Sequence, residues 1–211
     1  MEITEIRKTK RGRFSLYIDG EFACVLHPEV YALSGLSVGG SIKEPELEQL
    51  RARSAEKRAR EKALSLLARR SYTGEGLCAK LTEHTGDERA AAAAVARMQE
   101  LGLVDDADYA RRFAADCLNL KHYSLTRTAR ALCEKGIDRE LIESVLSEVG
   151  FDPEAAAARI VKRRYLRYLG DEKGAMKTIA ALQRLGYDYG DIRAVLRNLA
   201  EDPDYYEEYG D

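Results

Sequence analysis

Residues 132–138 read LCEKGID, and a helical pattern of apolar residues follows them. The phrase returns as LQRLGYD at residues 182–188, and a looser copy, LTEHTGD, occupies residues 81–87. In each copy, small or apolar residues lie four, seven, eight and eleven positions after the aspartate, which is one face of an α-helix. The copies are spaced 51 and 50 residues apart, so they indicate a repeat array rather than an isolated turn.

A glycine and an aspartate form the turn inside this phrase. Gly136 and Gly186 stand where a helix ends, and glycine adopts the left-handed conformation of that position without steric cost. Asp138 and Asp188 follow two residues later, where a short carboxylate caps the free N–H groups of the next helix. In the looser copy Gly86 comes one position later, so we expect that turn to differ in detail.

The composition favours a mostly helical protein with a charged surface. Of the 211 residues, 45% are hydrophobic and 33% are charged, and there are only four prolines and no tryptophan. Ala, Leu, Glu and Arg dominate after residue 45, and all four suit helices. The net charge of −2 and the isoelectric point near 6.0 argue against nucleic-acid binding through overall charge. Any such binding must depend on where the cations lie.

The sequence contains no signal for export, for a membrane span or for a metal centre. No apolar run approaches the length of a transmembrane helix, and residues 1–4 do not begin a signal peptide. The cysteines at positions 24, 78, 117 and 133 are scattered, without the spacing of zinc ligands. We therefore expect a cytoplasmic protein with reduced thiols, no membrane contact, no metal and no cofactor.

The first 50 residues differ from the rest and predict a small extension that contains a β-hairpin. Residues 14–18 alternate between apolar and polar side chains, and Asp19-Gly20 is a strong hairpin signal. The expected elements are strands at residues 3–6, 14–18 and 21–26 and a brief helix that begins near Pro28.

Three tandem three-helix repeats are expected to follow and to form an elongated, curved body with one long face. The first helix of repeat one spans residues 55–70, and residues 46–50 either form a separate helix or continue into it. Further helices are expected near residues 105–120, 124–135, 138–149, 153–169, 172–185 and 188–200. The predicted boundaries are 1–50 for the extension, 51–102, 103–150 and 151–200 for the repeats, and 201–211 for a frayed acidic tail.

Cations concentrate in the first helices of repeats one and three. Residues 51–70 contain eight Arg or Lys side chains against two glutamates, and no acidic residue lies between Arg159 and Gly170. Pairing at i,i+4 therefore cannot neutralise the second group. The basic turn at residues 7–13 either contacts phosphate or is a solvated hairpin tip. The candidates for contact with a partner or with DNA are Lys57, Arg58, Arg60, Arg69, Arg70, Lys80, Arg111, Arg112, Arg127, Arg130, Lys135, Arg163, Arg164 and Arg167.

No combination of residues predicts catalysis. Asp105 and Asp106 could suggest metal or acid–base chemistry, but both lie where a helix begins, and Asp105 suits the capping position. His27, His84 and His122 belong to different elements, and no nucleophile elbow or phosphate-binding glycine loop occurs. We expect no catalytic residue.

Three stretches resemble the RecX family of bacterial regulatory proteins: residues 71–73 with 77–81, residues 101–106 with 109–113 in the sequence LGLVDDADYARRF, and residues 134–138. Residues 74–76 depart from the family pattern, since Gly74 and Gly76 stand where basic residues are more common. The resemblance implies three tandem three-helix repeats and a cytoplasmic, non-enzymatic protein. It further implies binding in the groove of the RecA–DNA filament, with inhibition of recombinase, ATPase and co-protease activities. Such a protein would act in DNA repair, homologous recombination and the SOS response.

A stand-alone nucleic-acid-binding helical-repeat protein is the alternative. Basic helices with interleaved tyrosines favour it, whereas the acidic tail and the low isoelectric point oppose tight independent binding. We expect a monomer whose partner is a RecA filament, with single- or double-stranded DNA as a further candidate partner.

Overall fold

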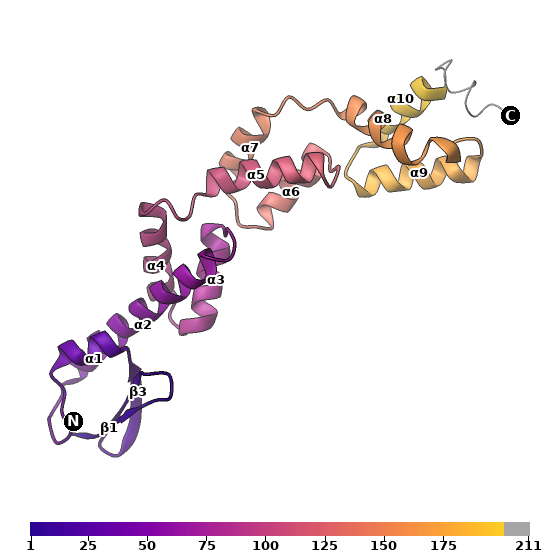
Figure 1. Ribbon diagram of the computed structural model, residues 1–211. Coiled ribbons are helices and arrows are strands. Elements are labelled where there is room, and N and C mark those ends of the chain that lie inside the picture. Colours follow the sequence, from indigo (N-terminus) through magenta and orange to yellow (C-terminus); the bar gives the residue numbers. More distant parts are fainter. Residues whose placement is uncertain (201–211) are drawn as a thin grey trace. The chain divides into compact units, whose positions relative to one another are not determined.

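Helices preceded by a small sheet make up the fold (Figure 1). The computed structural model describes residues 1–200, and the acidic tail expected at residues 201–211 lies outside them. The described residues form three β-strands, ten α-helices and one 3₁₀ turn, which confirms the predicted fold class. They divide into two units, residues 1–105 and the residues from Asp106 onward. No helix among them is long and apolar enough to cross a membrane.

One antiparallel sheet opens the first unit, in the order β1-β2-β3, with bounds Ile3–Lys8, Phe14–Ile18 and Glu21–Leu26. Asp19 and Gly20 join β2 to β3 with φ of 50° and 85°, as the hairpin signal predicted. α1 (Pro28–Ser34) confirms the brief helix. The buried side chains of the sheet pack against Ile42 and Leu47.

Three helices complete the first unit: α2 (Glu44–Leu67), α3 (Gly74–Thr85) and α4 (Glu88–Glu100). α2 is continuous, so residues 46–50 run into the first helix and form no separate one. Alanines at positions 55, 59 and 63, every fourth residue of α2, are buried on one face and leave room for α3 and α4. Leu77, Leu81 and Met98 fill the resulting core.

The second unit holds two helix triplets with separate cores. The first consists of α5 (Asp106–Asn119), α6 (Leu125–Cys133) and α7 (Arg139–Ser147), with Leu132 and Ile142 in its core. The second consists of α8 (Pro153–Arg164), α9 (Glu172–Arg184) and α10 (Tyr189–Ala200), with Leu182 and Ile192 in its core. The repeat boundaries, like the capping role of Asp105, stay predictions.

The turns of the repeated phrase have the expected chemistry. Gly136 and Gly186 have φ of 75° and 92°, in the left-handed region where glycine is favoured. Asp138 accepts a hydrogen bond from the Glu140 N–H, and Asp188 accepts one from the Asp191 N–H. In the looser copy the Thr85 hydroxyl also takes part, because it donates to the Leu81 carbonyl.

α8 is shorter than the sequence predicted, because it ends at Arg164 and not near residue 169. Tyr165 leaves the helix with φ of −125°, and a 3₁₀ turn, η1 (Leu166–Tyr168), follows. Tyr165 and Leu169 then pack against the core of this triplet. No glycine or proline marks the end of the helix in the sequence, so tertiary packing decides it.

The turn between α9 and α10 lies against the start of α6. The Ser124 N–H donates to the Leu185 carbonyl at 2.9 Å, and the Ser124 hydroxyl donates to the Gly186 carbonyl at 2.7 Å. A Cβ on Gly186 would lie 2.6 Å from that hydroxyl oxygen and from the Arg127 Cβ. Gly186 therefore meets two needs, a left-handed turn and a close approach to α6.

Ser124→Ala is expected to lower the free energy of unfolding of the second unit by about 1–3 kcal/mol. The substitution removes the α6 cap, since the hydroxyl oxygen also accepts from the Arg127 N–H, and it leaves the Gly186 carbonyl without its donor. Denaturant unfolding followed by circular dichroism measures the change. Ser147→Ala is the matched control, because that exposed hydroxyl donates only within α7, to the Ser144 carbonyl. Equal effects of the two substitutions would contradict the role given to Ser124.

Candidate anion-binding surfaces

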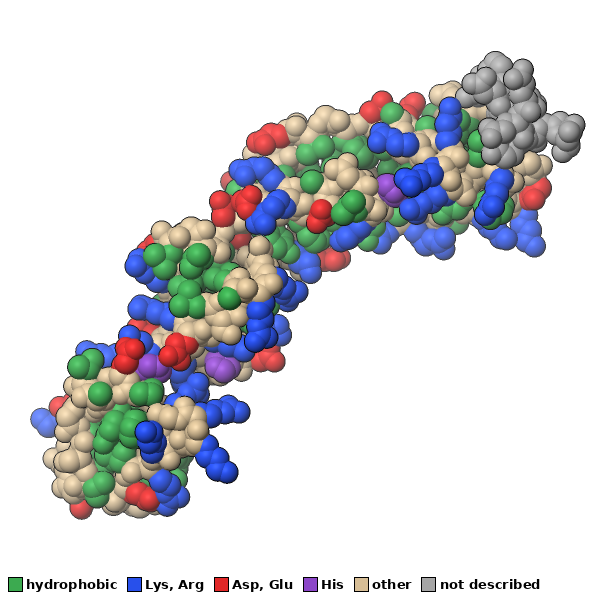
Figure 2. Space-filling view, in the orientation of Figure 1, with side chains coloured by type: hydrophobic (Ala, Val, Ile, Leu, Met, Phe, Trp, Pro, Cys, Tyr) green, Lys and Arg blue, Asp and Glu red, His purple; other side chains and the backbone are tan. Residues whose placement is uncertain are grey.

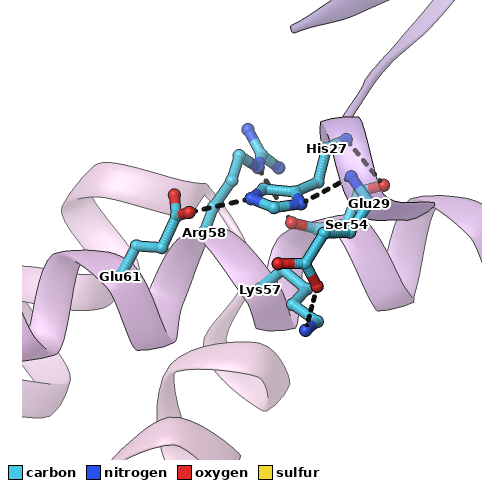
Figure 3. Close-up of polar contacts among 6 residues, drawn as sticks. All are labelled: His27, Glu29, Ser54, Lys57, Arg58 and Glu61. Atoms are coloured by element: carbon cyan, nitrogen blue, oxygen red, sulfur yellow. Dashed lines mark hydrogen bonds and ion pairs between the residues drawn. The ribbon is translucent and has the colours of Figure 1, made fainter. Parts of the chain in front are cut away.

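A cluster of polar side chains joins the sheet region to α2 (Figure 3). The His27 Nδ1 atom accepts a hydrogen bond from the Glu29 N–H and so caps α1. Because Nδ1 accepts, the ring proton lies on Nε2, which is 2.9 Å from the Glu61 Oε1 atom. The His27 N–H donates to the buried Ser54 hydroxyl at 3.2 Å. Both ring nitrogens and the backbone N–H of His27 therefore have partners within the chain, which gives this residue a structural role.

Two of the predicted contact residues belong to this cluster. Lys57 forms an ion pair with Glu29, and the Arg58 Nε–H donates to the Ser54 carbonyl at 3.3 Å. Burial, followed by the charge of Arg13, lowers the pKa of Arg58. Lys57 thus links α2 to α1, whereas the Arg58 contact lies within α2. Both side chains have partners in the chain, which makes them weaker candidates for an interface than their sequence position suggested.

The charges that act on His84 of α3 define a first basic cluster in the first unit. It comprises His84, Arg11 and Arg13 of the β1–β2 turn, and Arg58 and Lys62 of α2. The pKa of His84 is lowered, first by burial and then by the charges of Lys62, Arg13, Arg58 and Arg11. Since all four cations act on one imidazole, the region has a positive potential that an anion would relieve.

A second basic cluster lines a cavity of about 600 Å³ inside the second unit. It comprises Arg111 from α5, His122 from the α5–α6 loop, and Arg159, Arg163 and Arg164 from α8. On the face drawn in Figure 2, Lys and Arg side chains gather over this unit beside a histidine. Among the residues that the structure describes, no carboxylate forms an ion pair with these four arginines.

The pKa of His122 reports the positive potential of the second basic cluster. The backbone of His122 is left-handed, with φ of 58°, which is uncommon for a residue other than glycine. Burial is the first cause that lowers the pKa of His122, and the charges of Arg164, Arg163 and Arg159 follow. The three arginines of α8 therefore act on the ring from across the cavity. Neutral His122 can still donate or accept one hydrogen bond there.

The remaining predicted residues are dispersed, and several have partners within the chain. Lys80 pairs with Glu83 and Arg112 with Asp108, each one helical turn away. Cation–π contacts hold Arg70 over Tyr72, Arg127 over Tyr123 and Arg167 over Tyr168. The others are exposed, on α2, on α6 or just after them: Arg60, Arg69, Arg130 and Lys135. From the predicted set, Arg111, Arg163 and Arg164 line the cavity of the second basic cluster, whereas Arg127 and Arg130 line a different one beside α6.

Sequence reasoning missed Arg11, Arg13, Lys62, His84, His122 and Arg159 as site residues. Some signals were present: Arg58 and Lys62, like Arg159 and Arg163, are four residues apart and so share a helix face. The basic turn at residues 7–13, with phosphate contact as one of its two interpretations, was another such signal. Nothing in the sequence places His84 or His122 among cations, because that depends on packing between elements far apart in the chain.

The described residues offer no group of three or more His, Cys, Asp or Glu side chains that could hold a metal ion. All four cysteines are unpaired thiols in the structure, and burial is the main cause that raises the pKa of Cys24 and of Cys117. For Cys24 and Cys117 these are the properties of packed cysteines, not of reactive ones.

The four arginines that line the cavity of the second basic cluster give it the chemistry of an anion-binding site.

Comparisons with known proteins agree on one family. A family model described as "RecX, second three-helix domain" matches residues 105–146. "Regulatory protein RecX" of Clostridioides difficile (strain 630) is 28% identical, over 96% of this chain and 98% of its own length. The protein of the same name from Clostridium botulinum (strain Eklund 17B / Type B) is 27% identical over 92% of each chain.

Solved structures share the fold. A crystal structure of regulatory protein RecX superposes with a TM-score of 0.62 at 20% identity, covering 92% of this chain and 98% of the other. RecX from Lactobacillus salivarius gives a TM-score of 0.61 at 19% identity, covering 70% and 98%. RecX regulatory proteins are not enzymes, in agreement with the reading of the sequence. In sequence along nearly the whole chain, and in fold, this protein is similar to regulatory proteins of the RecX family.

Proposed function

We propose that this protein binds RecA–DNA filaments and lowers their recombinase, ATPase and co-protease activities. The observation that carries the proposal is the similarity to RecX regulatory proteins along nearly the whole chain, because the resemblance to that family implies a RecA partner. Binding in the filament groove is part of the proposal. A regulator of this kind needs surfaces that recognise a filament carrying phosphate and acidic side chains.

The two basic clusters support this function physically. An isoelectric point near 6.0 means that the protein as a whole does not attract polyanions at neutral pH. Cations gathered at two places can still steer association with a filament, because local potential and not net charge governs the encounter. Arg111, Arg159, Arg163 and Arg164 are the contact residues we favour in the second unit, and Arg11, Arg13 and Lys62 in the first.

Titration of the protein against RecA filaments on single-stranded DNA tests the proposal. We expect the single-strand-dependent rate of ATP hydrolysis to fall as the protein is added, and the protein to sediment with the filament. The RecA-free strand serves as the control for binding to DNA alone. Unchanged hydrolysis at saturating protein, together with no co-sedimentation, would refute RecA regulation.

Stand-alone binding to nucleic acid is the second candidate, and the positive potential of both clusters is the observation in its favour. A salt titration separates the two functions. A filament regulator should bind the filament much more tightly than the bare strand at physiological salt, because protein contacts with RecA are less sensitive to salt than phosphate contacts. Equal affinity for the two at every salt concentration would favour the stand-alone binder.

A further inference from the structure

Charged and apolar side chains both line the cavity of the second basic cluster. We name the four arginines and His122 the arginine wall. Six large apolar side chains also line the cavity, and we name them the apolar wall: Leu118, Val145, Val149, Phe151, Ile160 and Tyr187. Phe151 is only partly buried, so part of its side chain remains available to a ligand. A volume of about 600 Å³ falls in the range of sites for small molecules.

The charge on this lining is unbalanced. Two carboxylates, Glu148 and Asp152, also line the cavity, against four arginines. Asp152 is already in use, because its Oδ1 atom accepts the Ala155 N–H and caps α8. Cations near a helix C-terminus are favoured by the helix dipole, which accounts for Arg163 and Arg164 at the end of α8. It does not account for Arg159, one turn earlier, or for Arg111 on α5.

We propose that this cavity binds a nucleotide, with its phosphate on the arginine wall and its base against Phe151 and the neighbouring apolar side chains. Guanidinium groups bind phosphate oxygens with paired hydrogen bonds, and several of them suit a dianion better than a single carboxylate. An apolar wall next to them suits a flat base and not a bare inorganic anion. The nucleotide is either free in solution or one unit of a single strand.

This proposal goes beyond RecA regulation, because it concerns a site inside the second unit and its test uses no RecA. The probes are ADP, pyrophosphate, a 15-residue oligothymidylate and a ten-residue oligoglutamate peptide. Calorimetry gives the affinities, and NMR follows the imidazole of His122, which a His122→Gln variant assigns. His27 lies in the first unit, outside both basic clusters, and serves as the internal reference for ADP binding.

We expect ADP to bind more tightly than pyrophosphate and to shift the His122 resonance. The bound phosphate should also raise the pKa of His122, since its charge opposes those of Arg159, Arg163 and Arg164 on α8 and of Arg111 on α5. The carboxylates of Glu148 and Asp152 line the same cavity and also favour a higher pKa of His122, but they do so with or without ligand. If only the oligothymidylate binds and moves His122, the nucleotide is one that belongs to a strand.

Two variants locate the ligand within the cavity. Arg163→Gln/Arg164→Gln should weaken ADP binding at least about tenfold. Arg193→Gln/Arg197→Gln, which removes the same charge from exposed positions of α10 outside the cavity, should leave it unchanged. Phe151→Leu should weaken ADP but not pyrophosphate, because only the base meets that wall.

The proposal is overturned if no probe moves the His122 resonance or if pyrophosphate binds as tightly as ADP. The first result would mean that the cavity binds none of these ligands. The second would mean that it binds simple anions without a preference for a base. Tighter binding of the oligoglutamate peptide than of ADP would assign the cavity to an acidic protein segment. Thermal unfolding of each variant confirms that a loss of binding is not a loss of fold.

Discussion

Gly174→Ala is expected to destabilise the second unit by at least about 3 kcal/mol. A Cβ at Gly174 would lie 1.8 Å from the carbonyl oxygen of Tyr168 and 2.8 Å from its carbonyl carbon. These are backbone atoms, so no side-chain rotation can relieve the clash. Either η1 or the first turn of α9 must move. The usual gain from replacing a helical glycine by alanine, about 1 kcal/mol, is too small to offset this.

The buried contacts around Gly174 show what such a movement would break. The Gly174 N–H donates to the Asp171 carboxylate at 2.6 Å, which caps α9. Its carbonyl accepts from the hydroxyl of Thr178, a side chain with no exposed surface. Displacement of the first turn of α9 would therefore strand polar groups in the core of the triplet as well as open a gap beside η1.

Hydrogen exchange followed by mass spectrometry measures this effect, with peptides of the first unit as internal references. Gly170→Ala is the matched control: it lies four residues earlier, a Cβ there meets no atom within 4 Å, and its φ is not positive. We expect hydrogen exchange in α9 and η1 to become faster in Gly174→Ala. In Gly170→Ala the exchange rate should not increase, because that substitution should be neutral or slightly stabilising. Equal protection of α9 and η1 from exchange in the two variants would contradict the prediction, because it would show that η1 can move at little cost.

Gly174 also illustrates what the sequence could not predict about the fold. Helix ends marked by local chemistry were found correctly, as with Gly136 followed by Asp138, because capping depends on residues a few positions apart. The predicted end of α8, near residue 169, was wrong by about five residues, because the helix ends at Arg164. That end depends on the fit of η1 against α9, a contact between segments with no recognisable stop signal.

The candidate site shows the same division between local and long-range information. Arg163 and Arg164 stand out in the sequence because no acidic residue lies within helical reach of them, and that is a property of one helix. Their convergence with Arg111 and His122 requires α5, the α5–α6 loop and α8 to meet around one cavity. Conversely, the sequence did not reveal that Lys57 pairs with Glu29.

Charge reversal in the second basic cluster is expected to have the largest effect on filament binding. Arg163→Glu/Arg164→Glu replaces two cations by two anions beside Arg159, and we expect the affinity for RecA–DNA filaments to fall about a hundredfold or more at low salt. The plot of log affinity against log salt should also become shallower, by about 0.7–0.9 for each phosphate that the protein no longer neutralises. Helical content should remain, because both side chains are exposed and glutamate is a good helix former.

The matched control separates position from total charge. Arg193→Glu/Arg197→Glu changes the net charge by the same amount at exposed positions of α10 that do not line the cavity. If both double variants lose affinity equally, long-range repulsion explains the result and the second basic cluster is no contact surface. If neither loses affinity at any salt concentration, the first basic cluster becomes the leading candidate. Arg11→Glu/Arg13→Glu then tests it, because these two arginines of the β1–β2 turn act on His84, and neither takes part in the Lys57–Glu29 ion pair or in the hydrogen bond from Arg58 to the Ser54 carbonyl.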